Sequence, residues 1–180
     1  MDTLLFSERS IWTMLHGIIL GGGALLGMSA ALYTLVTVRV TEGWGAAAEA
    51  QARYLGWLLA GVAVLLWLTV LVGTYISFPP YRATPPEGIT DLAAYPRAML
   101  HAAPGTVWLH SFAMEVKEHV PWIAAMLATA VAFVGLRERS RLLTDASLRR
   151  MAVSLLVICF TLVSFISLLG VFINKVAPLE

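Results

Sequence analysis

Four long stretches without Asp, Glu, Lys or Arg constrain this chain more than any other feature. They cover about residues 11–38, 54–78, 120–136 and 151–173. A helix of roughly 17 to 25 apolar residues crosses a bilayer, and a continuous apolar segment in lipid satisfies its backbone groups only as a helix. Since 59% of the 180 residues are hydrophobic and 13% are charged, we predict an all-α integral membrane protein folded as a four-helix transmembrane bundle.

The remaining composition excludes several classes of protein. A net charge of +1 gives no basis for nucleic-acid binding, and Cys159, the only cysteine, has no second thiol for an internal disulfide. The first apolar stretch is too long for a secretory signal and lacks a basic start, so we expect it to remain as a membrane helix. Residues 1–180 are therefore predicted to form a single transmembrane domain.

The arginines indicate the orientation of the chain. Two connections, residues 39–53 and 137–150, hold seven of them: Arg39, Arg53, Arg137, Arg139, Arg141, Arg149 and Arg150. Because Lys and Arg collect on the cytoplasmic side of short loops, both connections should face the cytoplasm. We expect a multi-pass protein of a bacterial-type inner (cytoplasmic) membrane with both termini extracytoplasmic.

The long connection between the second and third spans, about residues 79–119, is then an extracytoplasmic cap. It contains six prolines, which block regular helix. Pro121 leaves the start of the third span open. The span begins at Pro121, with an interfacial helix before it, or extends back to about residue 106 with a proline inside it.

The segment from His110 to His119 carries two histidines, two carboxylates and a lysine directly before an uncharged run. Ionisable groups are costly to place beside lipid and are usually functional there. At 100° per residue, Glu115 and His119 share a helix face, whereas His110 lies on the opposite face. One straight helix therefore offers the two histidines to different sites. His16, on the first span, is predicted to lie at the same membrane depth.

Three interpretations of these residues remain open. In the first, the segment is a solvated surface helix. In the second, His16 and either His110 or His119 ligate one b-type haem in the outer half of the membrane, and Glu115 orients a ligand. In the third, His16, Glu115 and His119 bind a non-haem metal. Met14 and Met114 are weaker axial candidates. Since all four histidines lie at the outer side, a two-haem relay across the bilayer is not expected.

Glycines on the first span admit two explanations. Gly17–Gly21 and Gly23–Gly27 are GxxxG pairs, which let another helix approach closely. Alternatively, Gly17 and Gly21 let a flat cofactor pack against the helix. We therefore include them with His16, His110, His119 and Glu115 as candidate cofactor-binding residues.

The function predicted from these features is that of a membrane subunit in an electron-transfer or respiratory assembly. It would hold one b-type haem and exchange electrons with an outer protein partner or with a quinol near Tyr75, Phe78 and Tyr81. The expected partners are membrane lipid and other subunits of the assembly. The alternatives are a cofactor-free accessory or assembly subunit of a larger membrane complex and a small metal-dependent membrane enzyme, so the sequence does not decide whether the protein is an enzyme.

Overall fold

The chain is all-helical in its described part. A computed structural model describes residues 6–38 and 45–178, and none of these residues lies in a β-strand. Four of its helical stretches are long and apolar enough to cross a membrane: Glu8–Thr37, Ala46–Tyr81, Leu109–Arg137 and Ala146–Val176. The predicted all-α class and the four predicted spans are thus confirmed, and the chain has the features of a multi-pass membrane protein.

Three of the four stretches change from α-helical to π-helical winding along their length, and two short helices lie in the connections. The elements in chain order are α1 (Glu8–Met14), η1 (Leu15–Gly21), α2 (Gly22–Thr37), α3 (Ala46–Val72), η2 (Gly73–Ser77), α4 (Phe78–Tyr81), α5 (Pro96–His101), η3 (Leu109–Met114), α6 (Glu115–Arg137), α7 (Arg139–Thr144) and α8 (Ala146–Val176), where η marks the π-helical segments.

Each helix is longer than the predicted span. The chain is already helical at Ala46, so Arg53 belongs to α3 rather than to a loop; alanines at positions 46–48 favour helix there. The third helix starts at Leu109 and contains Pro121, which places the His110–His119 segment within the helix and not in the cap. Residues 137–150, predicted as a loop, include α7. Arg39 lies outside the described residues.

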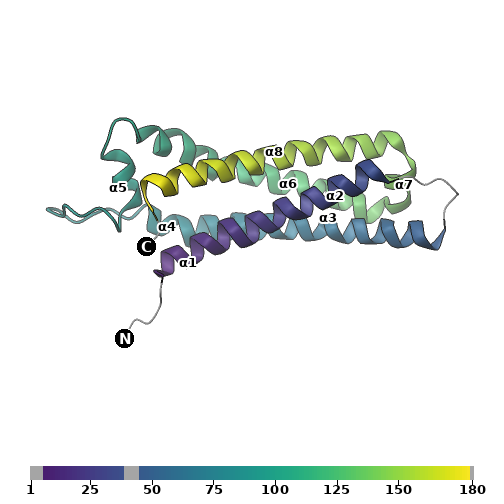
Figure 1. The fold of residues 1–180 in the computed structure, drawn as a ribbon, viewed down its shortest axis with the longest axis horizontal. Coiled ribbons are helices and arrows are strands. Elements are labelled where there is room, and N and C mark those ends of the chain that lie inside the picture. The colour runs from purple at the N-terminus through teal and green to yellow at the C-terminus, as the bar shows by residue number, and fades with distance from the viewer. Residues whose placement is uncertain (1–5, 39–44, 179–180) are drawn as a thin grey trace.

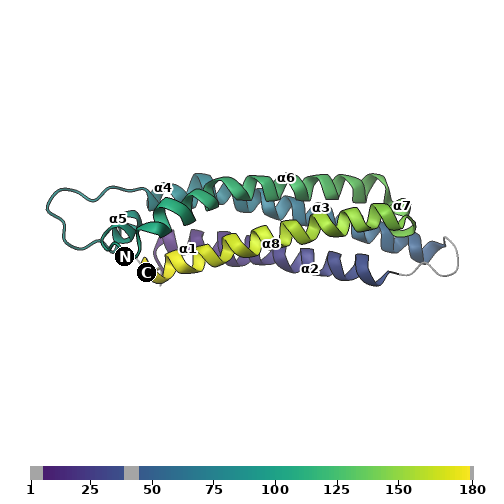
Figure 2. The ribbon, with the colours of Figure 1, turned by 90° about the horizontal axis from the view of Figure 1, so that it is seen from above.

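The four long helices run side by side along the longest axis of the molecule (Figure 1). The start of α1, α4, α5 and the end of α8 gather at one end, which we call the α5 end, while α7 lies at the opposite α7 end. The view turned by 90° shows the same division, with the irregular connection between α4 and α5 projecting beyond the α5 end (Figure 2). Loop residues at the two ends are therefore kept far apart.

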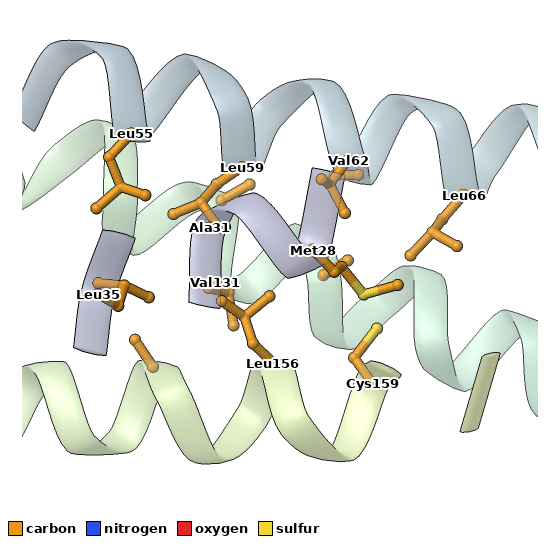
Figure 3. Packing of buried hydrophobic residues seen from close by; sticks show 14 of the residues in the cluster. Met28, Ala31, Leu35, Leu55, Leu59, Val62, Leu66, Val131, Leu156 and Cys159 are labelled. Carbon is orange, nitrogen blue, oxygen red and sulfur yellow. The ribbon is translucent and has the colours of Figure 1, made fainter. Parts of the chain in front are cut away.

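Apolar side chains from all four long helices fill the core between the ends (Figure 3). Met28, Leu35, Leu59, Leu156 and Cys159 are almost completely buried. Without water to drive apolar groups together, helices in a membrane associate through close packing and interhelical hydrogen bonds. This core supplies the packing that holds the helices at fixed positions.

The helices α3 and α6 approach each other closely. A Cβ atom built on Gly56 would lie 2.8 Å from the backbone oxygen of Gly135, so only glycine fits at this crossing. The indole Nε1 of Trp67 donates a hydrogen bond to Thr129 Oγ1 at 2.9 Å and the Trp67 ring packs edge-on against Trp122. These contacts fix α3 and α6 against each other.

Asp145 starts the last helix. Its carboxylate accepts hydrogen bonds from the backbone amides of Leu148 at 3.2 Å and Ser147 at 2.8 Å, as an N-cap residue does. These bonds hold the pKa of the Asp145 carboxyl below its usual range. The cap therefore favours the ionised carboxylate at the turn between α7 and α8.

A second, smaller group of buried residues attaches α5 to the long helices. Leu100 of α5 is fully buried in this group. Its other buried members come from α4, η3 and α8: Tyr81, Leu109, Ala113, Met114, Leu169 and Ile173. The connection between the second and third long helices is thus anchored at its α5 portion beside the long helices.

Candidate functional site

A cavity of about 760 Å³ opens at the α5 end of the helices. Its walls come from all four long helices and include residues of α1, η1, α3, η2, α6 and α8. Sites for small ligands and cofactors occupy roughly 300 to 1,000 Å³ and combine apolar walls with a few polar groups. The cavity has this size and character, and we treat it as the candidate site.

The three π-helical segments lie around this cavity. Gly17 and Gly21 of η1, Gly73 and Ser77 of η2, and Met114 of η3 all line it. A π-helical turn is rare and frequently lies at a functional site. Three such segments at one level of the molecule are a second, independent indication of a site.

His16 is held against the second long helix. Its imidazole fills the space that a side chain at Gly73 would need: a Cβ built there would lie 2.6 Å from His16 Cε1. Its Nδ1 is buried without a hydrogen-bond partner among the described residues. This unpaired ring nitrogen is available to a ligand.

His119 reaches the same cavity from α6. Its Nδ1 lies 2.8 Å from the backbone oxygen of Glu115, one turn earlier, and donates a hydrogen bond to it. This bond places the proton on Nδ1 and leaves Nε2 as a free lone pair. The Glu115 carboxylate is 3.9 Å from Nδ1 and largely exposed, and Glu115 does not line the cavity.

His110 lies elsewhere, as expected from its opposite helix face. Its Nδ1 is 2.7 Å from the hydroxyl of Tyr81, and its ring centre is 4.7 Å from that of His101, which is exposed. Tyr81 lines the cavity but His110 does not. Of the predicted site residues, the structure thus brings together His16, His119, Gly17 and Gly21, and leaves His110 and Glu115 outside.

Of the other residues that the sequence suggested as ligands or as quinol contacts, some line the cavity and one does not. Met14, Met114 and Phe78 line the cavity with Tyr81, whereas Tyr75 is exposed and lies outside it. A Cβ on Gly17 would meet nothing within 4 Å, so that position leaves open space. By contrast, the second GxxxG pair packs on α3: a Cβ on Gly27 would lie 2.7 Å from Val62 Cγ2.

Several polar residues of the cavity were not selected from the sequence, namely Arg9, Ser77, Lys117 and Asn174. In the described part of the chain, three buried side-chain nitrogen or oxygen atoms have no hydrogen-bond partner: Arg9 Nη1, His16 Nδ1 and Ser77 Oγ. All three belong to residues that line this cavity. Since buried polar atoms are normally paired, their concentration here indicates a place for a ligand.

Within residues 6–38 and 45–178, no three His, Cys, Asp or Glu side chains are grouped closely enough to hold a metal ion. The non-haem set of His16, Glu115 and His119 is thus not assembled. A flat cofactor ligated by two imidazoles does not need such a group. No protein-family profile matches the chain, and no curated protein or solved structure is significantly similar to it.

Proposed function

We propose that this protein is a membrane subunit of an electron-transfer or respiratory assembly and that its cavity holds one b-type haem. One observation carries the proposal. His16 and His119, from the first and third long helices, line the same cavity. His16 Nδ1 is buried without a partner in the described chain, and His119 Nδ1 donates to the Glu115 carbonyl, which leaves Nε2 of that ring free. Ring nitrogens without a protein partner are available to a metal centre, and a backbone carbonyl that holds the other nitrogen orients such a ligand.

The rest of the cavity suits a flat, largely apolar group. Gly17 and Gly21 present backbone without side chains, while Met14 and Met114 add apolar surface. Helix-bundle interiors are common places for such cofactors. When bound, haem supplies one-electron redox chemistry. The chain's own contribution is to supply two imidazoles, of which that of His119 is largely exposed, together with apolar walls and several polar groups.

Orientation follows from charge. Arginines cluster at the α7 end, where α7 itself holds Arg139 and Arg141 and α8 begins with Arg149 and Arg150 close by. If this end faces the cytoplasm, the cavity lies in the outer half of the membrane and the long connection containing α5 is extracytoplasmic. Electrons would then arrive from a quinol beside Phe78 and Tyr81 or from an outer protein partner.

The experiment is an absorption spectrum of gently solubilised protein expressed with sufficient haem. We expect a sharp reduced-minus-oxidised Soret and α band typical of two imidazole ligands. His16→Ala and His119→Ala should each remove that signature. His101→Ala is the matched control, because His101 is exposed and does not line the cavity, so its spectrum should be that of the wild type.

A folded, haem-supplied and colourless wild-type protein would contradict the proposal. Co-purification of that colourless protein with a large membrane complex would instead identify a cofactor-free accessory subunit. Retention of the bands in both His16→Ala and His119→Ala would contradict the assignment of the ligands.

A further inference from the structure

Charges around the cavity are not balanced. Arg9 and Lys117 line it with a single carboxylate, Glu118. The ion pairs within the described residues join His119 with Glu115, and Arg141 with Glu138 and Asp145. Lys117 therefore has no anionic partner there, although it is part of a helix long and apolar enough to span a membrane.

The position of Lys117 is defined by packing. The residue is partly buried, and its Nζ would lie 3.0 Å from a Cβ built on Gly170 of α8. Gly170 also lines the cavity. The ammonium group is thus placed between α6 and α8, where the absent side chain at position 170 leaves room for it.

Other residues that line the cavity carry hydrogen-bond donors without an acceptor in the described chain. Arg9 Nη2 donates to the backbone oxygen of Pro178 at 2.7 Å, but Nη1 of the same guanidinium is buried and unpaired within the described chain. Ser77 Oγ is also buried and unpaired within the described chain. Asn174 contributes a side-chain amide to the cavity wall. Cations and donors without acceptors in a low-dielectric site favour a ligand that brings negative charge.

We propose that the cavity binds its amphipathic ligand through a carboxylate or phosphate group and that Lys117 pairs with that group. The apolar walls take the rest of the molecule. This inference deepens the proposed function: in haem the negative groups are the two propionates. A phospholipid headgroup offers the same chemistry from another source, and the experiment separates the two.

The first arm compares haem b with its dimethyl ester, which lacks the propionate charges but keeps the ring and the iron. Binding to the purified protein is measured by titration of the Soret band. A charge-assisted hydrogen bond lost on esterification should weaken wild-type binding roughly 10- to 100-fold. In Lys117→Gln the acid and the ester should bind within about threefold of each other, whereas Lys117→Arg should restore the preference. Lys175→Gln is the control, because Lys175 is exposed and outside the cavity.

The second arm replaces haem by lipid. Native mass spectrometry of protein exchanged into phosphatidylglycerol or phosphatidylcholine should show retention of the anionic lipid by the wild type and its loss in Lys117→Gln. If the wild type retains the anionic lipid and binds neither form of haem, the proposed haem function fails while the anionic site stands, with phosphate as its source. If both forms of haem bind equally, haem binding stands but Lys117 does not pair with the propionates.

The inference is overturned if the wild type prefers neither haem b over its dimethyl ester nor phosphatidylglycerol over phosphatidylcholine. It is also overturned if Lys117→Gln keeps the wild-type preference. Size-exclusion elution and thermal unfolding establish that each variant is folded. If Lys117→Gln does not fold, the wild-type comparison of acid with ester and of anionic with neutral lipid decides the matter alone.

Discussion

Replacing Gly73 by alanine tests the position of His16 directly. All three nearest atoms to a Cβ at residue 73 belong to the His16 imidazole, with Cε1 at 2.6 Å, Nδ1 at 3.2 Å and Nε2 at 3.3 Å. Carbon atoms in favourable contact lie about 3.5 to 4.0 Å apart. The ring therefore has to move by about 1 Å away from residue 73.

The expected loss follows from that displacement. A 1 Å misplacement of a positioned group can cost about 100-fold in its function, so we expect Gly73→Ala to weaken haem binding by one to two orders of magnitude. Overpacking should also destabilise the fold by about 1 to 3 kcal/mol. Alanine itself suits the helical backbone at this position (φ −57°, ψ −51°), so the effect comes from the contact and not from the conformation.

The assay combines two readouts. Nitrogen chemical shifts of ¹⁵N-labelled histidine report the His16 ring independently of any cofactor, and a Soret titration reports haem affinity. Gly61→Ala is the matched control, because Gly61 lies on the same helix and a Cβ there would meet nothing within 4 Å. The gain in helix propensity from Gly to Ala is then common to both variants. Unchanged His16 shifts in Gly73→Ala would refute the reasoning.

Three further predictions concern stability, which thermal unfolding in detergent can measure. Gly56→Ala pushes α3 away from the backbone of α6 and should lower the free energy of unfolding by about 1 to 3 kcal/mol. Gly61→Ala should leave it almost unchanged, so equal melting temperatures of these two variants would show that the close crossing does not contribute to stability. Trp67→Phe removes an interhelical hydrogen bond and should cost about 1 kcal/mol, and an unchanged melting temperature would contradict this. Since the pKa of Asp145 is lowered in the folded state, its stabilisation is present above the usual carboxyl pKa of about 4 and is lost as the pH falls through the folded value. Asp145→Ala should therefore lower the free energy of unfolding at pH 7 and make it less dependent on pH below 4. If the free energy of unfolding of the variant changes with pH as steeply as that of the wild type, the Asp145 cap does not cause the pH dependence.

The helices could be predicted from the sequence because their signal is local. Each span is a continuous apolar run, so its existence does not depend on what packs against it. Their ends were harder to place: the helix containing Arg53 begins earlier than the uncharged run, and the helix containing Pro121 begins well before it. Helix ends lie in polar segments, where hydropathy gives no information and capping or tertiary contacts decide the boundary.

The candidate site could be predicted only in part. Two of its histidines, His16 and His119, stand out because imidazoles are rare near spans. Lys117 did not stand out, because a lysine beside an apolar run is usually a solvated residue at the end of a span. Its packing against Gly170 is visible only in the structure. Gly73 is one glycine among many, and the π-helical segments have no compositional signature. These features depend on how distant helices meet, which spacing along one chain does not encode.

Pro121 has a consequence for the motion of the third long helix. A proline has no amide hydrogen, so the carbonyl of Lys117, four residues earlier, lacks its usual α-helical donor. That turn therefore has one backbone hydrogen bond fewer than a regular helix, and it carries the side chain that we expect to bind a ligand. A ligand bound to Lys117 would then restrain the helix at this turn. Hydrogen exchange of the backbone amides near residues 117–121 should become slower on binding, even if the helices do not shift.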